Sequence, residues 1–120
     1  MSIKPPECWR LDPQARALRV ETSIGHSILL PFEHLVVSAF DNGDDGETLK
    51  MEFSSHEILL RGVGLKRVEA ALQRRELAEV SVLPLRFRES TPKGHPIIHE
   101  IQVTIPEEPT ATAPAKGKTQ

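Results

Sequence analysis

The chain has 120 residues, 17 acidic and 15 basic side chains, and a formal net charge of −2. A length in this range is typical of one domain, and 33 Leu, Ile, Val and Phe residues suffice for a hydrophobic core. The small net charge excludes a strong overall attraction to nucleic acid or anionic membranes. A single cysteine, Cys8, excludes an intramolecular disulfide framework and a multi-cysteine zinc site. No apolar run suits a membrane helix or a signal peptide, so we expect a cytoplasmic protein without a membrane partner.

The two ends of the chain differ in composition from its middle. Residues 106–120 contain no Leu, Ile, Val, Met or aromatic residue. Such a segment cannot bury enough apolar surface to offset its ordering entropy, so we expect a disordered tail at 106–120. Residues 1–14 are predicted to be a partly ordered extension, in which Trp9 and Leu11 dock on the body. The folded unit is predicted to be one domain over 15–105.

Alternation of apolar and polar side chains dominates the first half of the chain and predicts β-strands. Pro31 cannot donate to a strand ladder, so the strand that reaches it is expected to lie at a sheet edge or to end there. The Asn, Asp and Gly residues at 41–46 give the strongest turn signal, because they tolerate positive φ. The expected strands lie at 18–22, 28–32, 35–40, 49–53 and 57–61.

The apolar period changes to that of a helix in the second half of the chain. Leu65, Val68 and Leu72 have i, i+3, i+7 spacing, which predicts a helix over 65–77 with these side chains on its buried face. The pattern returns to that of a strand at 80–87, although Pro84 interrupts it.

The last predicted strand, at 97–105, is rich in isoleucine. Strict alternation would place residues 97, 99, 101, 103 and 105 on one buried face. We therefore expect this strand in the centre of its sheet.

Runs of strands with one helix predict an α+β fold. We expect an antiparallel sheet of five to seven strands with one amphipathic helix packed on it. Because one short helix covers only one face of the sheet, we expect either that the other face is exposed to solvent or that the sheet curls into a partial barrel.

The histidines do not predict a metal site or a cofactor. His95 and His99 have the spacing of paired ligands on a helix, but on a strand four residues span about 13 Å. The acidic turn at 41–47 matches part of a calcium-loop template, since Asp41 and Glu52 fall at its first and last positions. The predicted flanks are strands rather than helices, so this segment is interpreted as a hairpin turn, and weak calcium binding is left open.

No catalytic set is recognisable, and we expect a protein that is not an enzyme. Gly62-Val63-Gly64 resembles the opening of a dinucleotide fingerprint, but Arg67 stands where the third glycine would be. The glycines are interpreted as turn residues. Ser54-Ser55-His56 are neighbours without a nucleophile motif, and Cys8 lacks a basic environment beyond nearby Arg10.

Charge is segregated along the chain. Residues 33–57 carry seven acids and one lysine, a net −6, whereas residues 61–93 carry eight bases against four acids, a net +4. On the predicted helix, a stripe opposite the apolar face is formed by Lys66, Arg67, Ala70 and Arg74. A basic helix face can contact an acidic partner or phosphates.

These features predict a small non-catalytic binding or adaptor domain that acts through protein–protein contacts or self-association, with Lys66, Arg67 and Arg74 as contact residues. The alternative is nucleic-acid binding through the same helix face. A third hypothesis is a small metal- or ligand-binding protein with a histidine-lined pocket.

Overall fold

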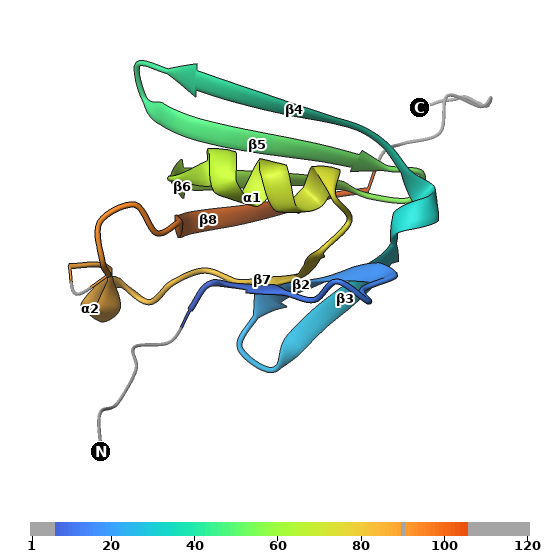
Figure 1. The fold of residues 1–120 in the computed structure, drawn as a ribbon, viewed down its shortest axis with the longest axis horizontal. Helices are drawn as coiled ribbons and strands as arrows, with labels where there is room; N and C mark the ends of the chain where they lie inside the picture. Colours follow the sequence, from blue (N-terminus) through green and yellow to red (C-terminus); the bar gives the residue numbers. More distant parts are fainter. Residues whose placement is uncertain (1–6, 90, 106–120) are drawn as a thin grey trace, which may run out of the picture.

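The computed structural model describes residues 7–89 and 91–105 as a mixed α+β fold of two four-stranded sheets, with a helix packed against both (Figure 1). The predicted tail at 106–120 lies outside the described residues, as do residues 1–6 of the predicted extension. The elements are β1 (Trp9–Leu11), β2 (Ala17–Ser23), β3 (His26–Pro31), η1 (Phe32–His34), β4 (Leu35–Gly43), β5 (Gly46–Phe53), β6 (Glu57–Val63), α1 (Leu65–Gln73), β7 (Leu77–Val80), α2 (Leu85–Arg88) and β8 (Ile97–Thr104).

The sheet architecture corrects the prediction of a single antiparallel sheet with five to seven strands. Within the described residues, eight strands form two sheets, ordered β1-β7-β2-β3 and β4-β5-β6-β8, and these sheets do not close into a barrel. One pair, β2 with β7, is parallel. The chain changes sheets at Pro31, where β3 ends, and the following turn η1 buries Phe32 in the core. The expectation that this strand lies at an edge and ends at Pro31 is confirmed.

The core lies between the two sheets. Leu49, Met51 and Phe53 alternate along β5 and are buried, as the sequence predicts, and Leu18 and Val20 face them from the first sheet. Burying each such side chain contributes about 1.5–3 kcal/mol. The turn expected at 41–46 is confirmed in its centre only. Strand β4 continues to Gly43, which pairs with Gly46, so that Asp44 and Asp45 close the hairpin.

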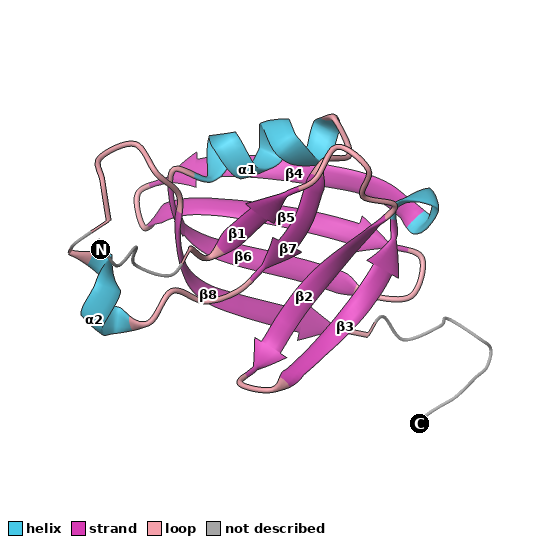
Figure 2. Cartoon of the chain, turned by 60° about the horizontal axis from the view of Figure 1, so that its bottom comes forward, coloured by secondary structure: helices cyan, strands magenta, loops and turns pink. Residues whose placement is uncertain are grey.

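The helix α1 packs along one side of the two sheets and contacts β4, β5 and β7 (Figures 1 and 2). The predicted apolar face is confirmed, since Leu65, Val68 and Leu72 are all almost completely buried. The helix is shorter than predicted and ends at Gln73, because Arg75 adopts a left-handed conformation with φ 59° that stops helix propagation. The chain then continues directly into β7, which pairs with β1 on one side and with β2 on the other.

The prediction of a strand at 80–87 is wrong, because the structure has a loop and a short helix after Val80. Strand β7 ends at Val80, and a loop that contains Pro84 leads into the one-turn helix α2. Proline removes a ladder donor, and its ring holds the preceding residue extended rather than helical. Leu83 still anchors this loop, because its side chain is buried and its N–H donates to the carbonyl of Ile98 at 2.9 Å.

The last strand differs from the prediction in two ways. It lies at the edge of its sheet rather than in the centre, because only β6 pairs with it. Its alternation is also interrupted by a bulge opposite Arg61 and Gly62, so that Ile98 becomes buried while His99 is exposed. An extra residue in one strand shifts the inward-facing set by one position.

Candidate functional site

The cationic face of α1, formed by Lys66 and Arg67 together with the C-cap residue Arg74, is exposed to solvent. The helix orients these residues outward because its opposite face is fixed in the core by Leu65 and Val68. The sequence predicted both faces of this helix. It also placed Ala70 in the exposed stripe, whereas that residue is half-buried.

The three cations differ in their local contacts. The Lys66 Nζ lies 5.6 Å from the centroid of the Phe40 ring, a cation–π geometry. The Arg74 Nε forms an ion pair with Glu76 Oε1 at 3.3 Å. Within residues 7–89 and 91–105, no ion pair or side-chain hydrogen bond involves Arg67. All the N–H donors of the Arg67 guanidinium are therefore available to a partner.

The N-terminus of α1 is capped by a residue from the second sheet. Glu47, on β5, accepts a hydrogen bond from the Leu65 N–H through its Oε1 at 2.8 Å. The helix has no side-chain cap of its own and no acidic residue in its first turn. A carboxylate here satisfies a free donor and interacts favourably with the helix dipole. Sequence reasoning missed this contact because the two residues are 18 positions apart, and the missing local cap was the only signal.

The two glycines before α1 have steric roles, but only Gly64 is a turn residue as interpreted from the sequence, since Gly62 lies within β6. Gly64 occupies the helix N-cap position with φ 69°, a left-handed conformation that L side chains rarely adopt. Gly62 lies directly against β8, where a Cβ atom would be 1.9 Å from the carbonyl oxygen of Ile97. This arrangement explains the glycine pattern without a bound dinucleotide.

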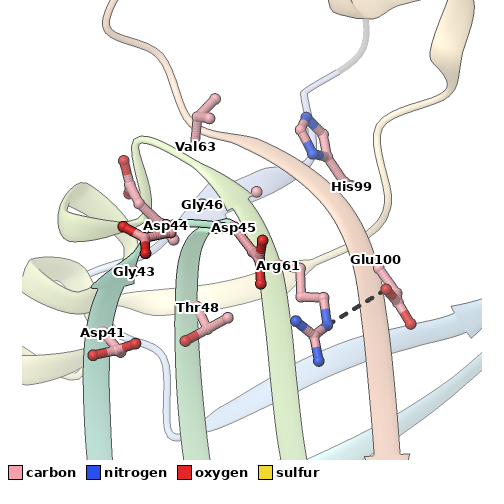
Figure 3. A pocket seen from close by; sticks show the side chains of 12 residues that line it. Asp41, Gly43, Asp44, Asp45, Gly46, Thr48, Arg61, Val63, His99 and Glu100 are labelled. Carbon is pink, nitrogen blue, oxygen red and sulfur yellow. Dashed lines mark ion pairs between the residues drawn. The ribbon is translucent and has the colours of Figure 1, made fainter.

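The acidic turn borders an open hollow of about 480 Å³ on the outer face of the second sheet (Figure 3). Asp41, Thr48, Arg61 and Glu100 lie in register across its four strands, and Arg61 Nε pairs with Glu100 Oε1 at 3.5 Å. Carboxylates outnumber cations around the hollow. The flanks are strands, so the helix–loop–helix geometry of the calcium template is absent from the turn.

The structure does not gather the histidines into one site. His26 begins β3, His34 lies in η1, and His95 precedes β8. His56 Nδ1 lies 2.7 Å from Ser55 Oγ in an exposed turn, and no carboxylate of the described chain pairs with this imidazole. In the part of the chain that the structure describes, no three His, Cys, Asp or Glu side chains are grouped to hold a metal ion.

Two titratable groups have shifted pKa values. Burial raises the pKa of the Cys8 thiol, whose Sγ donates to the Pro96 carbonyl at 3.3 Å. A buried, protonated thiol is a poor nucleophile. Partial desolvation lowers the pKa of His99, and the positive charge of Arg88 lowers it further.

The comparisons with known proteins add no relative: no family model, curated protein or solved structure matches this chain. Neither helix in residues 7–89 and 91–105 combines the length and apolar character needed to span a bilayer.

Proposed function

We propose that this protein is a non-catalytic binding module that docks an acidic segment of a partner protein on the cationic face of α1. The observation that carries the proposal is the exposed Arg67 guanidinium, which has no ion-pair partner in the described chain, on a helix whose opposite face is buried. The helix is held at its start by Glu47 and along its length by both sheets, so the cations are presented from a rigid support. A fixed support lowers the ordering cost of binding.

The test compares capture from the source cell by the native protein and by the double variant Arg67→Glu/Arg74→Glu. Lys93→Glu is the matched control, since Lys93 is an exposed cation outside the helix. Reversing two exposed charges replaces two attractions by two repulsions of about 0.2–1 kcal/mol each, so we expect the binding of any acidic partner to weaken by about fourfold to several hundredfold. The control should retain the same partners, and equal capture by the double variant would refute the proposal.

The same experiment distinguishes binding to protein from binding to nucleic acid. A nuclease-treated sample should keep its captured protein if the contact is direct. Loss of the captured material on nuclease treatment, together with a steep decrease of oligonucleotide binding with salt, would favour the nucleic-acid alternative.

A further inference from the structure

Strand β4 forms an open edge of the second sheet. It spans nine residues, Leu35–Gly43, and pairs only with β5. In Figure 1 it is the outermost strand of the second sheet. Alternate backbone N–H and C=O groups of an edge strand point away from its one partner. These groups can pair with another strand.

The other sheet edges are better protected than β4. Strand β1 has three residues, and β3 ends in Pro31. The edge of β8 is partly covered, because the Leu83 N–H and the Arg88 guanidinium donate to carbonyls of Ile98 and His99. Soluble proteins protect long edges with such devices or with charged side chains.

The side chains of the first six residues of β4 provide no such protection, and the nearest charge that the structure places on them is Lys66 of α1, over Phe40. Residues 35–40 include no charge and no proline. Val36 and Val37 are 70% and 48% exposed, so two adjacent apolar side chains face water on this strand. A bulge between Leu35 and Val37 disturbs the start of the strand but leaves the ladder from Val37 to Gly43 regular.

The surroundings of the two ends of β4 differ in charge. Asp41, Asp44 and Asp45 lie at its C-terminal end, in and beside the hairpin turn. Arg16 and Arg75 line a second hollow beside η1, which immediately precedes β4, and Glu33 is the acidic residue of that hollow. One end of the edge is therefore acidic, and the surroundings of the other end carry a net positive charge.

We propose that β4 pairs antiparallel with β4 of a second copy of this chain, forming a two-fold symmetric dimer with a continuous eight-stranded sheet. Antiparallel pairing reverses the partner strand, so the acidic end of each copy meets the basic end of the other. The exposed valines are covered near the two-fold axis. This inference does not use Arg67 or Arg74, on which the α1 proposal is tested, although Lys66 lies over Phe40 of β4. Either proposal can therefore fail without the other.

The first test measures the mass of the full chain by sedimentation up to about 1 mM, where associations of millimolar affinity or tighter become visible. We expect a concentration-dependent dimer. Val37→Lys places like charges near the axis in both copies and should weaken the dimer by roughly tenfold or more. Leu29→Lys is the matched control, because Leu29 is 56% exposed on the other sheet and should leave dimerisation unchanged.

A second test probes the charge complementarity with exposed residues whose substitution preserves the core. Asp44→Lys/Asp45→Lys should weaken the dimer, and adding Arg16→Glu to the same chain should restore much of the lost affinity, with greater effect at low salt. A monomer at every concentration would overturn the proposal. Equal effects of the Val37 and Leu29 variants, or no effect of the Asp44 and Asp45 changes, would also overturn it.

Discussion

Replacing Gly62 by alanine should strongly destabilise the fold by forcing β6 and β8 apart. The new Cβ would lie 1.9 Å from the carbonyl oxygen of Ile97, 3.0 Å from its carbonyl carbon and 3.1 Å from Ile98 Cα. All three are backbone atoms, so no side-chain rotation can relieve the overlap. Moving β8 away weakens one or two ladder hydrogen bonds, at about 1 kcal/mol each, and loosens the packing of fully buried Ile98, at about 2 kcal/mol.

The expected loss of unfolding free energy is therefore about 3–4 kcal/mol, or a decrease in Tm of at least about 12 °C for a domain of this size. Urea unfolding followed by circular dichroism measures it. Gly43→Ala is the matched control, because its φ is ordinary and the nearest atom to its added Cβ is a side-chain oxygen at 3.4 Å. We expect that control to change stability by less than about 1 kcal/mol. If the two variants are equally stable, the close approach of the strands does not restrict this position.

Three further predictions concern the cap and the two shifted groups. Glu47→Ala should reduce the unfolding free energy by about 1 kcal/mol, and Glu47→Gln by less, because the amide keeps an acceptor for the first N–H of α1. Equal losses would refute the capping role. In the native protein, iodoacetamide should modify Cys8 roughly a thousandfold more slowly than in denaturant, since the thiol reacts only through unfolding; fast native labelling would contradict its burial. An NMR titration should place the pKa of His99 below 6.5, and Arg88→Leu should raise it. Because the pKa of His99 is lower in the folded than in the unfolded protein, the free energy of unfolding decreases as the pH falls through the pKa of the unfolded state. The His99→Gln variant should show a smaller decrease. If Arg88→Leu leaves the pKa of His99 unchanged, or His99→Gln leaves the pH dependence of stability unchanged, the assigned cause is refuted.

The sequence alone located most of the strands, the hairpin turn and the buried face of the helix. These features depend on periodicity within a few residues, as in the alternation of Leu49, Met51 and Phe53 or the spacing of Leu65 and Val68. The end of the helix was predicted too late, because residues up to Leu77 have acceptable helix propensity and nothing local marks the left-handed conformation of Arg75.

The tertiary structure decided how the elements pair and what surrounds the charged residues. The split into two sheets and the edge positions of β4 and β8 follow from contacts between segments far apart in the chain. Likewise, the partners of Lys66 and Leu65, which are Phe40 and Glu47, come from other elements. Local patterns encode which side of an element is apolar, whereas packing of the whole chain determines which element covers it and which backbone edge stays open.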